Sequence, residues 1–137
     1  MDVRKVRMAA APGKILKILV ADDDQLSQYI IERMLEKQGH QFVPVYDGEQ
    51  CLQALEEGSF DLIFMDIQMP GMGGIEATRR IRAREDEKRS IPIVALTSHA
   101  MEGDRERFIA AGMDDYLSKP LDLLAINNLC QLFAGRE

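Results

Sequence analysis

The chain has 137 residues, 46% of them hydrophobic, which indicates a single domain with a core large enough to fold without disulfide or metal staples. Residues 1–17 carry a net charge of +4 against −10 for the remainder, and an acidic body disfavours direct nucleic-acid binding because phosphate groups are bound by Lys and Arg. No apolar run reaches the roughly 18 residues of a membrane-spanning helix and no secretory signal is recognisable, so we expect a cytoplasmic protein without membrane contact.

Short apolar runs alternate with segments of helical periodicity from residue 15 to residue 134, after a charged, Ala-rich segment at 1–14 that we interpret as a linker or tail. We expect strands at 15–21, 40–46, 61–66, 91–97 and 114–119. We expect helices at 24–39, 47–58, 74–87, 101–112 and 121–133. This alternation predicts a mostly parallel sheet with helices on both faces, and Pro44 indicates that the second strand lies at an edge.

Polar side chains follow the expected strands at the point where each strand ends. These residues are Asp22, Asp23 and Asp24 after the first strand, Asp66 at the end of the third, Thr97 at the end of the fourth and Lys119 after the fifth. In an open parallel sheet, ligands bind beyond the carboxyl ends of the strands. We therefore expect several carboxylates, a hydroxyl and an ammonium group to share one crevice.

The expected crevice has the chemistry of a phosphoryl-transfer site. Carboxylates a few ångströms apart require a cation or a proton, and oxygen ligands without His or Cys favour Mg²⁺ or a similar ion such as Mn²⁺. Lys119 and Thr97 supply a cation and a donor for phosphoryl oxygens, and Asp66 lies where it can attack phosphorus. Asp23 or Asp24 is also expected to cap the following helix. Each residue alone has an ordinary structural interpretation, so the prediction depends on the whole set.

Four motifs resemble those of the receiver domain of two-component response regulators, of the chemotaxis-regulator type. They are LVADDD, FMDIQMPGMGG, ALTSHA and DDYLSKPL. The resemblance covers residues 15–133, and the phrase MDIQMP is most similar to receivers of hybrid sensor histidine kinases or phosphorelay proteins. It implies that residues 15–134 form a flavodoxin-like, doubly wound (βα)5 receiver domain with a five-stranded parallel sheet in the order 2-1-3-4-5.

The resemblance also implies roles for individual residues. It makes Asp66 the phosphoacceptor. It assigns the metal site to Asp22, Asp23, Asp66 and the backbone carbonyl of Gln68, with Mg²⁺ or Mn²⁺ as the ion.

Switch residues follow from the same resemblance. Thr97 becomes the switch hydroxyl, Tyr116 the switch aromatic and Lys119 the phosphate-binding ammonium group, with a cis bond between Lys119 and Pro120. Gly73 departs from the pattern, because the family usually has Asp there, and Gly is a weaker helix cap than Asp.

The implied partner is a histidine kinase or a histidine phosphotransfer domain that donates the phosphoryl group. We expect no enzymatic activity of the isolated domain beyond its own phosphorylation and dephosphorylation, and a histidine kinase is one candidate for the parent chain. A weak homodimer through the fourth helix, fifth strand and fifth helix (101–112, 114–119 and 121–133) is a further expectation.

Two surface features have open or ordinary interpretations. Leu26, at the start of the first helix, is either an exposed docking residue for a phosphotransfer helix bundle or a core residue. The arginines of the third helix are interpreted as a solvated face. They are Arg79, Arg80, Arg82 and Arg84.

Other phosphate-handling classes fit less well. The GxxxxGK[ST] motif of P-loop NTPases is absent, and the first strand is followed by acids instead of a glycine fingerprint. A haloacid-dehalogenase-like phosphatase normally needs a second Asp two residues after the nucleophile, where this chain has Gln68. Two alternatives stay open: a Mg²⁺-dependent phosphatase with an aspartyl nucleophile, and a receiver-like binding or dimerisation module that is not phosphorylated.

Overall fold

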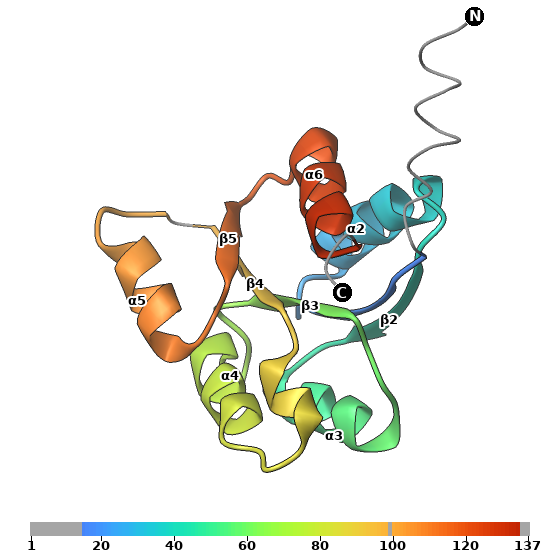
Figure 1. The fold of residues 1–137 in the computed structure, drawn as a ribbon. Helices are drawn as coiled ribbons and strands as arrows, with labels where there is room; N and C mark the ends of the chain where they lie inside the picture. The colour runs from blue at the N-terminus through green and yellow to red at the C-terminus, as the bar shows by residue number, and fades with distance from the viewer. Residues whose placement is uncertain (1–14, 99, 135–137) are drawn as a thin grey trace, which may run out of the picture.

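The computed structural model describes residues 15–98 and 100–134, and the linker or tail expected at 1–14 lies outside the described residues. The described chain forms one five-stranded parallel sheet in the order β2-β1-β3-β4-β5 (Figure 1). The strands are β1 (Lys17–Ala21), β2 (Gln41–Val45), β3 (Leu62–Asp66), β4 (Ile93–Thr97) and β5 (Asp115–Ser118). The helices are α2 (Gln25–Lys37), α3 (Gly48–Glu57), α4 (Gly74–Arg82), the 3₁₀ helix η1 (Glu87–Ser90), α5 (Asp104–Ala111) and α6 (Leu123–Ala134). The expected fold class and strand order are confirmed.

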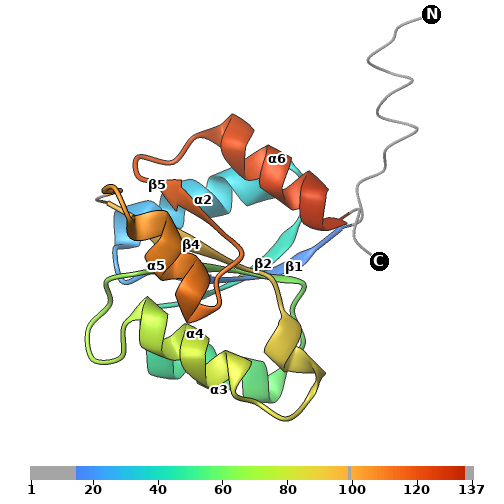
Figure 2. The ribbon, with the colours of Figure 1, turned by 60° about the vertical axis from the view of Figure 1, so that its left-hand side comes forward.

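Helices cover both faces of the sheet. Helices α2 and α6 lie on one face and α3 and α4 on the other, with α5 beside α4 and β5 (Figure 2). All five residues of β3 are buried, and alternate side chains enter the two cores. Ile63 and Met65 belong to the core under α3, α4 and α5, whereas Leu62 and Phe64 belong to the core under α2 and α6. A near-continuous apolar run in the sequence therefore marks a strand that is covered on both faces.

The edge position of β2 agrees with the expectation from Pro44. Within the described sheet, β2 pairs with β1 alone, and Pro44 stands in register with Val20. Proline cannot donate a ladder hydrogen bond, and an edge strand has one side where no such bond is needed.

Helix α2 begins after Asp24, which acts as its N-cap. The Asp24 carboxylate accepts hydrogen bonds from the backbone N–H of Leu26 (3.2 Å) and from the hydroxyl of Ser27 (3.0 Å). The buried face of the helix includes Ile31 and Leu35. Leu26 is 65% exposed, so its interpretation as a core residue is wrong.

Helix α4 is shorter than expected, because a new turn begins soon after it. The prediction of a helix at 74–87 is wrong beyond Arg82, where α4 ends. Asp86 caps η1 by accepting a hydrogen bond from the backbone N–H of Lys88 (3.2 Å). Its carboxylate also pairs with Arg84 at 2.7 Å, so local side chains satisfy the backbone and the charge of this turn.

Arg82 is a structural residue that joins three segments. Its guanidinium donates to the backbone carbonyls of Gly112 (2.8 Å), Arg89 (2.7 Å) and Ile91 (2.7 Å), and it pairs with Asp114 at 3.1 Å. It thereby ties the end of α4 to the segment before β4 and to the C-terminal end of α5.

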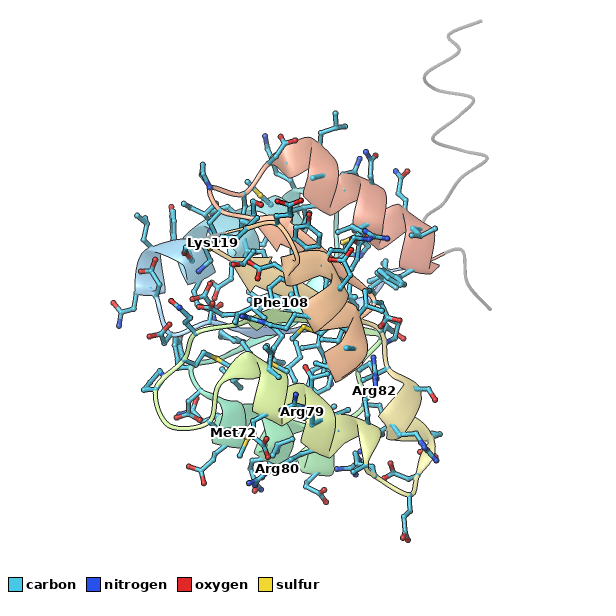
Figure 3. All side chains as sticks on the ribbon, turned by 90° about the vertical axis from the view of Figure 1, so that its left-hand side faces the viewer. Met72, Arg79, Arg80, Arg82, Phe108 and Lys119 are labelled. Carbon is cyan, nitrogen blue, oxygen red and sulfur yellow. The ribbon has the colours of Figure 1, made fainter. Side chains whose placement is uncertain are left out.

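The interpretation of the four arginines as a solvated face is confirmed only for two of them. Arg79 and Arg80 are exposed, and Figure 3 shows them along α4, with Arg82 closer to η1. Arg84 pairs with Glu56 of α3 at 2.7 Å as well as with Asp86. No helix among the described residues is long and apolar enough to cross a membrane.

Replacing Arg82 with Ala should lower the free energy of unfolding by about 2 kcal/mol, because it leaves partly buried carbonyls without a donor. Arg80→Ala is the matched control on the same helix. It should change stability by less than about 0.5 kcal/mol, because its ion pair with Glu76 is exposed. Urea unfolding measures both, and equal effects of the two substitutions would contradict the structural role of Arg82.

Candidate functional site

The carboxyl ends of β1, β3, β4 and β5 bring the predicted site residues to one edge of the sheet. Asp22 follows β1, and Asp66 is the last residue of β3. Lys119, which follows β5, places its Nζ 2.9 Å from Asp22 Oδ2 and 3.4 Å from Asp66 Oδ2. Figure 3 shows Lys119 near α2, at this edge of the sheet. The structure therefore brings together acids and an amine that are separated by up to 97 positions in the chain.

Three carboxylates form a compact group at this edge. Asp22, Asp23 and Asp66 each offer an oxygen, and these oxygens lie within 4.8 Å of one another. Asp22 and Asp66 are buried, whereas Asp23 is exposed. The carboxylate of Asp24 serves instead as the cap of α2, and its hydrogen bond from Ser27 lowers the pKa of Asp24. Of the three consecutive acids, Asp24 thus caps α2, whereas Asp22 and Asp23 belong to the carboxylate group.

The donor set fits a small divalent cation. Asp22 Oδ2 is buried and makes no hydrogen bond within the described residues, although it is in ion-pair contact with Lys119. A buried carboxylate oxygen without a donor, beside two further carboxylates, suits a hard cation that prefers oxygen ligands, such as Mg²⁺. His and Cys ligands are missing from this group, which disfavours zinc.

Burial and like charge govern the protonation of Asp66. Its removal from water, together with the nearby Asp22, raises the pKa of Asp66 to about 7, against the opposing effect of Lys119. Burial lowers the pKa of Lys119, but the close contact with Asp22 and the charges of both acids outweigh this effect, so the pKa of Lys119 is raised. Lys119 therefore stays charged, whereas Asp66 titrates near neutrality in the metal-free protein.

The loop after β3 packs tightly against the end of that strand. The backbone N–H of Gln68 donates to Asp66 Oδ1 at 3.1 Å, and the Gln68 side chain is exposed. Gly74, at the start of α4, has no space for a side chain, because a Cβ there would lie 2.2 Å from the backbone oxygen of Asp66. The preceding Gly73 occupies the cap position of α4 and provides no side-chain hydrogen bond.

Thr97 lies in a pocket beside Asp66, whereas Tyr116 packs against α5. Thr97 is buried at the end of β4 and lines a pocket of about 190 Å³ together with Asp66. Tyr116 is half-buried, and its ring packs against Phe108 of α5 with a centroid separation of 5.9 Å. The bond between Lys119 and Pro120 is cis, as expected.

Sequence reasoning missed the contribution of α5 to this pocket. Asp104 and Arg107 of α5 line it, as does Met101 from the segment before the helix. Their position after the fourth strand could have indicated this, because the segment following Thr97 starts at the same edge of the sheet.

Comparison with known proteins identifies one family. The sequence model described as "Response regulator receiver domain" matches residues 18–131. The chain is 43% identical over 123 residues to the sensor protein GacS of Pseudomonas syringae pv. syringae, and this match covers 86% of the chain but only 14% of GacS. The chain is therefore much shorter than this relative.

Solved structures give the same result. The chain aligns with the receiver domain of sensor histidine kinase PA1611 from Pseudomonas aeruginosa PAO1, with a TM-score of 0.81 and 39% identity. The alignment covers 90% of this chain and 100% of that chain. The PA1611 structure has a magnesium ion coordinated in its active site cleft. The chain also aligns with a chain in the co-crystal structure of two Saccharomyces cerevisiae proteins, the histidine phosphotransfer protein Ypd1 and the receiver domain of Ssk1. The TM-score is 0.79 and the identity 28%, and the alignment covers 88% of this chain and 89% of that chain.

In the metal-free protein, Asp66 should make the fold less stable as the pH rises. The folded pKa of about 7 lies above the ordinary value of 3.8, so the unfolded chain binds fewer protons between these values. The contribution is fully present below the unfolded pKa and is lost as the pH rises through about 7. Urea unfolding in EDTA from pH 5 to pH 8 should show this slope, and Asp66→Asn should reduce it. An unchanged slope in the variant would contradict the raised pKa.

Proposed function

This chain belongs to the response regulator receiver domain family, and we propose that residues 15–134 accept a phosphoryl group from a phosphohistidine onto Asp66. The single observation that carries this proposal is the contact of one ammonium group, Lys119 Nζ, with both Asp22 and Asp66 at the carboxyl edge of the sheet. An anionic group on Asp66 would meet this cation directly. The receiver family acts in two-component and phosphorelay signalling, which supports the direction of transfer.

A divalent cation belongs to this proposal. Carboxylates of Asp22, Asp23 and Asp66, with the backbone carbonyl of Gln68, are the proposed ligands of Mg²⁺ or Mn²⁺. When bound, the ion supplies positive charge that offsets the negative charges of the acids and of the phosphoryl oxygens. The magnesium ion in the PA1611 receiver domain supports Mg²⁺.

The group transfer is an in-line displacement at phosphorus. A carboxylate oxygen of Asp66 forms the new O–P bond, while the P–N bond to the donor imidazole breaks and its electron pair stays on nitrogen. Lys119 binds a phosphoryl oxygen, and Thr97 donates its hydroxyl to another. Attack of water on phosphorus later releases inorganic phosphate and restores Asp66. Asp66 of the isolated domain is thus itself phosphorylated and later restored. In this respect the domain differs from an enzyme, which acts on a separate substrate.

The conformational readout is assigned to α5 and its neighbours. Only Phe108 and Ala111 of α5 are buried, so this helix costs little to rearrange. As Thr97 moves toward the phosphoryl group, the ring of Tyr116 turns inward beside Phe108. This movement shifts the surface of α5, β5 and α6 between two states, and this surface is the proposed site of a weak homodimer.

A phosphotransfer helix bundle or a histidine kinase is the proposed donor. Exposed apolar side chains follow the start of α2, next to the carboxylate group: Leu26 is 65% exposed, Tyr29 58% and Ile30 37%. The complex of Ypd1 with the Ssk1 receiver domain supports this kind of partner. Because the chain covers only 14% of GacS, a histidine kinase parent and a cytoplasmic location are likewise proposals.

Two alternatives make different predictions. A phosphatase with an Asp nucleophile would use a second acid two residues after Asp66, but this position is the exposed Gln68. A binding module without phosphorylation would have no need for a cation buried beside two acids. The phosphatase alternative predicts many turnovers of p-nitrophenyl phosphate, and the binding module predicts no phosphate uptake.

Incubation with acetyl phosphate and Mg²⁺ should add one phosphoryl group to the wild-type chain, measured by intact mass. Asp66→Asn should abolish this gain, and EDTA should prevent it in the wild type. Asp61→Asn is the matched control, because Asp61 precedes the same strand at its other end and accepts a hydrogen bond from Lys17 N–H that Asn can keep. Phosphate on the Asp66→Asn protein would show that the nucleophile is a different residue.

Leu26→Asp should slow phosphoryl transfer from a phosphorylated histidine phosphotransfer domain about tenfold, because a charge replaces an apolar contact in the interface. Uptake from acetyl phosphate should stay within about twofold, because Leu26 is largely exposed and supplies no ligand to the carboxylate group. Leu132→Asp, at a similarly exposed position of α6, is the control and should leave both rates unchanged. Equal slowing by the two substitutions would exclude docking through the start of α2.

A further inference from the structure

An ion pair from α5 borders the pocket that contains the phosphoacceptor. Asp104 and Arg107, one turn apart in α5, line the pocket of about 190 Å³ together with Asp66, Gln68 and Thr97. This volume is open to solvent beside the carboxylate of Asp66. A phosphoryl group on Asp66, or a small phosphodonor approaching it, would share this space with the guanidinium of Arg107.

The two members of the pair are held very differently. The Asp104 side chain is 16% exposed, and its Oδ2 accepts a hydrogen bond from the backbone N–H of Met101 at 2.9 Å. The Arg107 side chain is 57% exposed, and its Nη1 lies 3.8 Å from Asp104 Oδ1. An ion pair this long and this exposed contributes little to stability. Arg107 can therefore leave Asp104 at low cost, whereas Asp104 stays in place.

The charges of the site provide a reason for such a move. Lys119 is shared between Asp22 and Asp66, so it is already neutralised before any phosphoryl group arrives. Phosphorylation brings Asp66 to a charge of about −2 and adds three strong acceptor oxygens. A planar guanidinium matches two such oxygens at once, which an ammonium group cannot do.

We propose that Arg107 is a second phosphoryl-binding cation of this site, which exchanges Asp104 for the phosphoryl oxygens on Asp66. Asp104 holds the guanidinium at the rim of the pocket until the anion arrives. This inference rests on the proposed function of Asp66, and it adds a contact made from α5, the helix assigned to the conformational readout. No covalent bond changes in this exchange: the ion pair of Arg107 with Asp104 is replaced by hydrogen bonds from Arg107 to the phosphoryl oxygens.

The first test measures the affinity of the Mg²⁺-loaded protein for beryllium fluoride, a phosphoryl mimic, by ¹⁹F NMR. Arg107→Gln should weaken binding about three- to fivefold, the range expected for a partly exposed ionic contact. Arg105→Gln is the matched control, because Arg105 is exposed on the same helix and carries the same charge without lining the pocket. It should stay within about twofold of the wild type. Equal effects of the two substitutions would reduce the role of Arg107 to general charge and overturn the inference.

The second test isolates the exchange of partners. Asp104→Asn keeps an acceptor for the Met101 N–H but releases Arg107, so beryllium fluoride should bind about twofold to threefold more tightly. In the Arg107→Gln background, this gain should disappear. A gain that persists there would mean that Asp104 acts by direct repulsion of the anion, and the exchange would be wrong.

Acetyl phosphate separates failure of this inference from failure of the proposed function. If the wild type gains phosphate on Asp66 but Arg107→Gln has the same half-saturating acetyl phosphate concentration as Arg105→Gln, the inference fails and the function stands. If the wild type gains no phosphate, both fail. Circular dichroism melts of Arg107→Gln, Arg105→Gln and the wild type should coincide within a few degrees, because neither arginine is buried.

Discussion

The chemistry of this molecule depends on a single ammonium group between two buried carboxylates. The side chains of Asp22 and Asp66 are 1% and 8% exposed, and that of Lys119 is 15% exposed. Buried acids are costly to ionise, and two adjacent ones are tolerated here because β5 delivers a cation to the edge where β1 and β3 end. The strand order makes this meeting possible. Strands β3 and β4 lie between β1, which is followed by Asp22, and β5, which is followed by Lys119. The topology of the sheet is thus a condition of the site.

One cation does not fully compensate the acids that surround it. The raised pKa of Asp66, about 7, reflects this deficit, with burial as its largest cause. The same deficit favours added positive charge at this site, because a metal ion bound there would stabilise the ionised acids. Asp66 is therefore a residue that disfavours the metal-free fold at neutral pH and favours the ion-bound one. A protein can tolerate such a destabilising residue at a functional site when the rest of the core is well packed. Buried apolar side chains fill the core on both faces of β3.

The sequence was sufficient to predict the parts that follow from periodicity and strand ends. The edge position of β2, a cap at Asp23 or Asp24 and the meeting of Lys119 with Asp66 belong to this group, whereas the full strand order was implied by the resemblance to receiver domains. The sequence was insufficient where the contacts of a long side chain depend on the folded structure. Arg82 looks like any exposed helical arginine in the sequence, yet four acceptors brought together by the fold hold it in place. Leu26 fits the helical apolar pattern but is exposed, because the buried face of α2 is formed by Gln28, Ile31 and Leu35.

The two ends of α5 are anchored very unequally, and this asymmetry connects the site to the surface. At its C-terminal end, Arg82 binds the carbonyl of Gly112 at 2.8 Å, and Asp114 accepts the backbone N–H of Ile93 at 2.8 Å. At its N-terminal end, the helix contributes Asp104 and Arg107 to the pocket, where contacts are polar and exposed. In the proposed readout, a change of charge on Asp66 would act on the end of α5 that carries the exposed Arg107, whereas the other end is tied to α4 through Arg82. A displacement at the N-terminal end would therefore tilt α5 about its C-terminal end in this proposal, and it would reach Tyr116 through Phe108, against whose ring Tyr116 packs.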